Sequence, residues 1–247
     1  MAEYIFNDND ISQHMVKYGA DVRPVITPKQ DRVRMQNYCN WLVENLPEHF
    51  ETIISGADRM EVRKVYAVDN NRIEMASFAM TARGPLFTFP KQLFGDVDRE
   101  TKLVDIRDVF DKAMTQFKRE FSGHNVLRVG CVNEIVFDCG NINPVEVIAS
   151  EVVKERWHKG LNNIKIHLEN PTEGFNVNVD IMPAYAQQVR EEAAGKRTGV
   201  RFGISVNIDV NNRQVDRDLE AEEITAILNY SDDYLANGLV KFLNNEQ

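Results

Sequence analysis

Apolar and polar residues follow a pattern that predicts the same order of elements twice along the chain. Residues 13–122 are predicted to form a strand, a helix, three or four strands and a closing amphipathic helix, and residues 123–247 repeat that order. Short links between consecutive strands are typical of antiparallel sheet. The sequence therefore predicts an α+β fold of two pseudo-repeats, each strand–helix–three or four antiparallel strands–helix, with the helices packed on one face of the sheet.

The two pseudo-repeats are predicted to share a core. Only Ser122-Gly123 separates them, and no low-complexity segment or linker lies between them. We therefore expect residues 1–122, which begin with a loose N-terminal arm, and residues 123–247 to be fused into one compact unit.

Two dipeptides predict where the first helix of each half begins. These are Thr27-Pro28 and Asn143-Pro144. A capping side chain accepts hydrogen bonds from the free amides of the first turn, and proline fixes φ at the first helical position.

The remaining elements follow from periodicity. The predicted strands lie within residues 13–27, 49–55, 61–68, 72–81, 84–89, 125–138, 162–169, 174–182 and 199–210. The closing helices are predicted over residues 104–121 and 219–245, and residues 184–198 are predicted to be a long hairpin tip or a short helix. The predicted buried stripe of helix 104–121 contains Ile106, Val109, Phe110, Ala113, Met114, Phe117 and Phe121.

The charge balance argues against nucleic acid as a partner. The formal net charge is −9 and the pI is about 5.2. Nonspecific attraction to nucleic acid or to an anionic membrane is therefore disfavoured. No stretch of the sequence is long and apolar enough to be a membrane-spanning helix, so we expect no membrane partner.

The cysteines predict a reducing compartment. Cys39, Cys131 and Cys139 are odd in number and scattered, which is typical of reduced thiols rather than a disulfide framework. We therefore expect a cytoplasmic protein. Cys139, at the end of a predicted strand, is expected to be the exposed thiol, whereas Cys131 is expected to pack as a small apolar residue.

Common catalytic and cofactor motifs are missing from the sequence. There is no G-x-x-x-x-G-K-[ST], G-x-G-x-x-G, H-E-x-x-H, C-x-x-C or G-x-S-x-G, and the five histidines are dispersed. We therefore predict no cofactor and no metal site.

One polar face is predicted in the second half. Three strands there alternate apolar residues with polar ones, and the polar set includes His167, Asn178, Asp180, Asn207 and Asp209. One interpretation is the solvated face of an antiparallel sheet. The other is a polar ligand or cation site around His167, Asp180 and Asp209, because Asn and Asp are poor strand formers.

Strand 125–138 adds candidates to that face. Its apolar file is interrupted by Asn133, which we expect to be buried and to need hydrogen-bond partners, most simply at a turn or a helix end. The opposite file carries Arg128, Glu134 and Asp138, which either pair with one another or face a ligand.

The first half predicts a second kind of surface. Strands 72–81 and 84–89 carry apolar residues on both faces, including Met75 with Phe78 and Leu86 with Phe87. Such a sheet must be covered on both sides. The cover is the N-terminal arm, the other pseudo-repeat or a second copy of the chain, so a homo-oligomer through strands 72–89 is one of three alternatives.

Two resemblances bear on these elements. The duplicated element order resembles the TATA-binding-protein-like topology, but a likeness of element order alone implies no function. The stretch Arg128-Val129-Gly130 with Asn133, and Ile208-Asp209-Val210 before the last helix, resemble a sporadically distributed family of uncharacterised bacterial proteins of about 250 residues. The Gly130–Asn133 spacing is shorter than in that family, and the resemblance implies no known activity.

Two functional hypotheses follow. The first is a non-enzymatic cytoplasmic binding or protein-interaction protein that uses a sheet face to hold a protein partner or small ligand. The reason is that the predicted strands and helices are amphipathic, whereas no set of catalytic residues is recognisable in the sequence. The alternative is a metal-assisted or acid–base hydrolase built around His167, Asp180 and Asp209, with Glu134 nearby. A nucleic-acid binder is disfavoured by charge.

Overall fold

The chain forms two compact units, each drawn from both ends of the sequence. The computed structural model describes residues 5–7, 11–57, 59–68, 71–90, 99–153, 163–172, 174–192 and 195–244. Unit 1 comprises Met1–His14, Asn133–Val210 and Asn229–Gln247, and unit 2 comprises Met15–Val132 and Asn211–Leu228. The boundary that the sequence predicts between the two pseudo-repeats, at residues 122 and 123, is a different division and stays a prediction.

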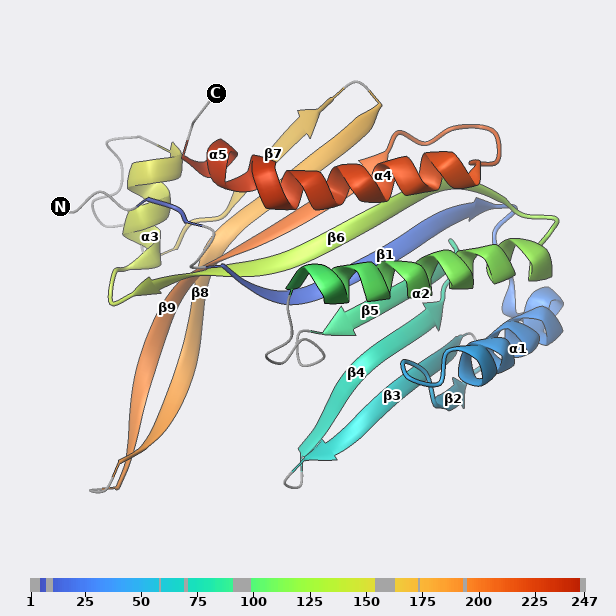
Figure 1. Ribbon diagram of the computed structural model, residues 1–247, viewed down its shortest axis with the longest axis horizontal. Helices are drawn as coiled ribbons and strands as arrows, with labels where there is room; N and C mark the ends of the chain where they lie inside the picture. Colours follow the sequence, from blue (N-terminus) through green and yellow to red (C-terminus); the bar gives the residue numbers. More distant parts are fainter. Residues whose placement is uncertain are drawn as a thin grey trace. The chain divides into compact units, whose positions relative to one another are not determined.

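Runs of strands separated by helices form an α+β fold, which confirms the predicted class. The strands are β1 (Ile11–Arg23), β2 (Thr52–Ser55), β3 (Met60–Val68), β4 (Asn71–Met80), β5 (Pro85–Pro90), β6 (Asn125–Gly140), β7 (Ile166–Pro171), β8 (Phe175–Glu192) and β9 (Gly195–Asn212). The helices are α1 (Pro28–Asn45), α2 (Arg99–Glu120), α3 (Pro144–Val147), α4 (Ala221–Asp233) and α5 (Leu239–Leu243) (Figure 1). Two π-helical turns, η3 (Ile148–Val153) and η4 (Tyr234–Gly238), continue α3 and α4.

The strands form an antiparallel sheet, as predicted. Their hydrogen-bonded order over the described residues is β2-β3-β4-β5-β1-β6-β9-β8-β7. Unit 2 holds β2 to β5, most of β1, the first part of β6 and the last two residues of β9, whereas unit 1 holds the rest of β6 and β9 with β8 and β7. None of the helices in the described part of the chain is both long and apolar enough to span a membrane.

Unit 2 has an aromatic core beneath α1 and α2. The predicted stripe of α2 is confirmed, since each of its members is buried. Tyr38 of α1 is also fully buried and donates its hydroxyl to the carbonyl of Ala113 at 2.9 Å. On the sheet side, Phe78 lies opposite Phe87 by register, with ring centroids 4.9 Å apart. The helices therefore dock on the sheet through interlocking rings.

The two predicted helix starts are confirmed, but their caps differ. Asn143 accepts a hydrogen bond from the amide of Val145 at 3.0 Å, as its residue type predicts. Thr27 does not cap α1 with its side chain. Instead, the Asp31 carboxylate accepts from the Thr27 amide at 2.9 Å. A carboxylate in the first turn is also favoured by the helix dipole.

Strands β4 and β5 correct the expectation of two apolar faces. Phe78, Met80, Phe87 and Phe89 share one buried face. The other face presents Ser77 opposite Thr88 and Ala79 opposite Leu86, and Leu86 is 37% exposed. The side chain of Met75 lies outside the described residues. Over the described residues 76–80 and 85–89, the second face is therefore mixed rather than apolar.

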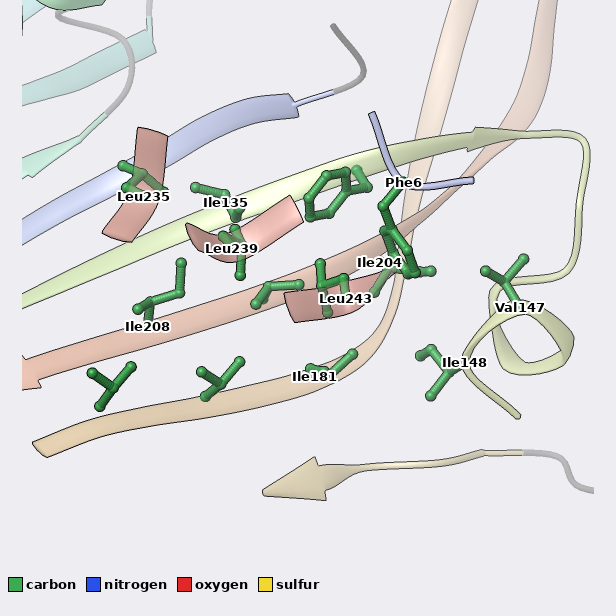
Figure 2. Close-up of a cluster of buried hydrophobic side chains, with 14 of the residues drawn as sticks. Phe6, Ile135, Val147, Ile148, Ile181, Ile204, Ile208, Leu235, Leu239 and Leu243 are labelled. Atoms are coloured by element: carbon green, nitrogen blue, oxygen red, sulfur yellow. The ribbon is translucent and has the colours of Figure 1, made fainter. Parts of the chain in front are cut away.

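Unit 1 has an aliphatic core on one side of its strands. Alternate residues of β6, β8 and β9 point toward leucines of η4 and α5, as Figure 2 shows for Leu235, Leu239 and Leu243. Phe6 belongs to this core and packs on Phe137 with ring centroids 5.1 Å apart. The backbone of Phe6 exchanges hydrogen bonds with the Asn244 amide at 3.0 and 2.9 Å. The loose-arm prediction is therefore wrong at residues 5–7, and residues 1–4 and 8–10 lie outside the described part.

Two further expectations are settled by the fold. Of the alternatives for residues 184–198, the hairpin is observed, because β8 runs to Glu192 and β9 begins at Gly195. Cys139 was expected to be exposed, and this is wrong: it is only 3% exposed within the unit 1 core. On β6 the odd-numbered residues point into the core, so Cys139 lies on the same side of the strand as Ile135 and Phe137. Cys39, Cys131 and Cys139 are all free and buried.

Candidate functional site on the polar face of unit 1

The polar face of unit 1 is the side of its sheet opposite the aliphatic core. It consists of polar residues that alternate with core residues on β6, β9, β8 and β7, and of Lys165 just before β7. These residues are Glu134, Asp138, Lys165, His167, Glu169, Asn176, Asn178, Asp180, Ser205, Asn207 and Asp209. Lys165, His167 and Glu169 are exposed, Ser205 is buried, and the others are half-buried. The predicted face therefore exists.

His167 and Asp180 are in direct polar contact on this face. They lie directly opposite each other on β7 and β8, and Nδ1 of His167 is 2.8 Å from Oδ1 of Asp180. Nε2 of the same ring is 3.3 Å from Oε1 of Glu169. The hydrogen bonds to Asp180 and then Glu169 raise the pKa of His167. Lys165 adds a second cation, with Nζ 3.7 Å from Oδ2 of Asp180.

The exposure of His167 bears on the two interpretations of this face, which are a solvated sheet face and a polar ligand or cation site. The ring of His167 is 51% exposed, so its contact with Asp180 lies in water rather than in an enclosed cavity. Within the described ranges, no group of three or more His, Cys, Asp or Glu side chains is placed to hold a metal ion. The pair is therefore a surface hydrogen bond flanked by Lys165.

The other predicted residues are distributed along the strands. Asn178 lies opposite Glu169 by register, and Asn207 and Asp209 are half-buried on β9. Glu134 is half-buried on β6. Arg128 belongs to unit 2, where its guanidinium lies 3.6 Å from the carboxylate of Asp21 on β1.

Asn133 plays the structural part that its position predicted. It is 2% exposed, and its amide nitrogen donates to the hydroxyl of Ser231, itself 1% exposed, at 3.3 Å. Ser231 lies in α4, so this buried pair fastens a strand to a helix. Buried polar groups in a core must be paired in this way.

Sequence reasoning missed a second structural asparagine, in unit 2. Asn212 at the end of β9 is 6% exposed, and its side-chain oxygen accepts from the Val129 amide at 2.8 Å. Its side-chain nitrogen donates to the Leu127 carbonyl at 3.2 Å. The amide group therefore bonds as a peptide unit of a neighbouring strand would. Asn211-Asn212 resembles an ordinary polar turn, so no signal in the pattern marked it.

The connection into α4 is also held by charge in unit 2. The Asp218 carboxylate accepts from the Val126 amide at 2.7 Å and from Lys118 Nζ at 3.0 Å. Arg217 makes a two-pronged contact with Glu223 at 2.7 and 2.6 Å, which lowers the pKa of Glu223 to about 2. Each of these charged side chains is already paired within the connection, which favours a structural role for them over a role in binding.

An open depression accompanies this connection. It is lined by Arg23, Gln214, Val215, Asp216 and Arg217, all in unit 2. It contains none of the predicted site residues. Binding and catalytic sites are usually enclosed and largely apolar with a few convergent polar groups, and this open depression is not of that kind.

The chain matches no family model and no curated protein.

Proposed function

We propose that this chain is a non-enzymatic binding protein that holds a cationic protein segment on the polar face of unit 1. The supporting observation is that polar and charged side chains occupy a half-buried sheet face while the described helical segments of unit 1 pack on the other face. Figure 2 shows that Val147 and Ile148 join the leucines of η4 and α5 in that core. Within the described part of unit 1, no helix packs on the polar face, which supports its use by a partner.

The charge of the face selects the chemistry of the partner. Among the described side chains of this face there are one lysine, one histidine and five carboxylates, namely Glu134, Asp138, Glu169, Asp180 and Asp209. Lys165 and His167 both lie against Asp180, at the β7 side of the face. The described side chains of the face are therefore more acidic than basic, and complementary potentials steer association and fix its orientation. Lysine- or arginine-rich segments fit such a face, whereas phosphate-bearing ligands are repelled.

A basic peptide provides the test of this proposal. Fluorescein-labelled decalysine is expected to bind at low ionic strength, with binding measured by fluorescence anisotropy. Glu134→Gln with Asp209→Asn is expected to weaken binding about tenfold, because two carboxylates of the face are neutralised. The control variant carries Glu44→Gln and Glu48→Gln, the same charge change at exposed positions of unit 2. Equal losses in both variants, or no binding by the wild type, would contradict the proposal.

The alternative function is a metal-assisted or acid–base hydrolase at the same face. The observation that favours it is the 2.8 Å contact between His167 and Asp180, a geometry used for proton transfer. Asp209 and Glu134 would then serve as further acid–base or ligand groups. The exposure of the His167 ring weighs against it, because catalytic groups work where water is displaced.

Thermal unfolding with divalent metals separates the two functions. We expect the Tm of the wild type to stay within about 1 °C when Zn²⁺ or Mg²⁺ is added, since a ligand stabilises only the state that binds it. Asp180→Ala serves as the matched variant. A metal-dependent rise in the wild type that disappears in Asp180→Ala would establish the alternative.

We also infer that the two halves arose by duplication, in the manner of the TATA-binding-protein-like topology. Two observations support this. In the sheet order, β5 lies beside β1, just as β9 lies beside β6, and in each half a hairpin-linked run leads up to that last strand. Each half also places its first helix directly after its first strand. The free thiols of Cys39, Cys131 and Cys139 support a cytoplasmic location.

A further inference from the structure

Strand β7 forms one edge of the sheet in unit 1. It pairs with β8 through residues 166–171 and is the last strand in the hydrogen-bonded order, so no strand of the described part of the chain lies beyond it. An edge strand carries a row of outward-pointing backbone N–H and C=O groups. A strand from another molecule can add to such an edge through main-chain hydrogen bonds.

The side chains of this edge fall on two sides. Ile166 and Leu168 lie on the core side, where both are half-buried against the aliphatic core. Lys165, His167 and Glu169 lie on the polar face and are exposed. A lysine alone on an edge strand discourages pairing with another chain. Here a glutamate follows the lysine four residues later, so opposite charges lie at equal distances on either side of His167.

One register of self-pairing brings these opposite charges together. If two copies of β7 pair antiparallel with His167 opposite His167, Lys165 of each copy lies opposite Glu169 of the other. On the core side, Ile166 of each copy then lies opposite Leu168 of the other. Facing pairs of opposite charge and of apolar side chains both stabilise a sheet. Even positions also meet even ones, so outward-pointing backbone groups meet and each face continues into the second copy.

The two neighbouring symmetric registers match less well. Centring the pair on Ile166 places Lys165 opposite His167, which sets two basic side chains against each other. Centring it on Leu168 leaves the glutamate to face His167 and sets Lys165 opposite Pro171, which has no N–H to donate to the ladder. The register centred on His167 therefore matches both the charges and the apolar residues.

We propose that β7 of a second copy of this chain pairs antiparallel with β7 in the register centred on His167. The contact is the same for both copies, so the dimer is two-fold symmetric and the two unit 1 sheets become one continuous sheet. The contact is formed by one short strand from each copy, so the dimer is weak and depends on protein concentration. This inference does not rest on the proposed function, because the second copy lies at the edge of the sheet and not on the polar face.

Two charge variants, studied alone and mixed, test this dimer. Lys165→Glu sets glutamate against glutamate across the two-fold axis, and Glu169→Lys sets lysine against lysine. Each variant alone is expected to dimerise about tenfold more weakly than the wild type, whereas an equimolar mixture of the two regains the affinity because every facing pair is again of opposite charge. Sedimentation velocity from about 10 to about 500 μM protein measures the dimer. The controls are Lys112→Glu and Glu44→Lys at exposed positions of unit 2, each expected to dimerise like the wild type.

A disulfide reports the centre of the pair. In His167→Cys the two new thiols lie opposite each other, and facing Cα atoms about 4.5–5.5 Å apart are within reach of a disulfide. In Lys165→Cys the two thiols are about 13 Å apart along the strands, so this variant is expected not to crosslink. The native cysteines are all buried. Non-reducing gel electrophoresis after mild oxidation compares the two variants.

The possible failures are distinguishable. A wild type that stays monomeric at the highest concentration, or a mixture no more dimeric than its two components, would overturn the proposal. Crosslinking of Lys165→Cys without crosslinking of His167→Cys would also overturn it. A dimer that survives both charge reversals and dissociates on Leu86→Asp would place the interface on strands 72–89 instead. Circular dichroism verifies that each variant folds, and the mixture contains the same two proteins that are measured alone.

Discussion

Replacing Phe117 with alanine is expected to lower the free energy of unfolding by about 3–5 kcal/mol. The Phe117 ring is fully buried in unit 2. It stacks on Phe121 with ring centroids 4.8 Å apart and meets Tyr38 edge-on at 5.8 Å. Removing the ring forfeits its transfer free energy and leaves a cavity that these rigid aromatic neighbours cannot fill.

Urea denaturation followed by circular dichroism measures this loss. Lys112→Ala on the exposed side of the same helix is the control, and it is expected to change the free energy of unfolding by less than about 0.5 kcal/mol. An unfolding midpoint that does not move in Phe117→Ala would mean that the ring is not enclosed as described.

Gly84→Val is expected to cost about 2–4 kcal/mol, for a backbone reason rather than a packing one. Gly84 has φ of 147°, a conformation that side chains rarely allow. A Cβ atom there would lie 2.2 Å from the carbonyl oxygen of Ala20. The turn that joins β4 to β5 must therefore move away from β1. The amide and carbonyl of Gly84 bond to Thr81 at 3.1 and 3.0 Å, and these bonds would be strained as well.

Gly123 provides the matched control. A Cβ atom at that position would meet nothing within 4 Å, so Gly123→Ala is expected to be neutral or slightly stabilising. The same urea titration compares the two glycines. If both substitutions had equal effects, the close approach of Gly84 to Ala20 would not be the cause.

Local periodicity explains which elements were predictable. The α2 stripe and the strands of both halves were located because burial on one face imposes a period on the sequence. The full lengths of β8, which ends at Glu192, and of β9, which begins at Gly195, were not predictable in the same way. Residues 184–198 mix glycine, alanine and charged residues, so their strand structure depends on cross-strand pairing rather than on a local pattern.

The candidate site was predictable as a face but not as a set of contacts. Alternation assigned His167, Asp180 and Asp209 to the same side of the sheet. Which of them meet depends on register, and the structure pairs His167 with Asp180. The role of Asn212 could not be predicted at all, because a side-chain amide that substitutes for a peptide unit leaves the hydrophobic pattern unchanged.

The hydrogen bonds between Phe6 and Asn244 hold two segments near the opposite ends of the described chain side by side. The two residues are 238 positions apart in sequence but exchange a pair of hydrogen bonds. Joining these ends through a short peptide and opening the chain elsewhere would reorder the sequence while leaving the contacts of unit 1 in place, since permutation is tolerated where ends are adjacent. We therefore expect a permuted chain, in which the second half precedes the first, to keep the core that surrounds Phe6.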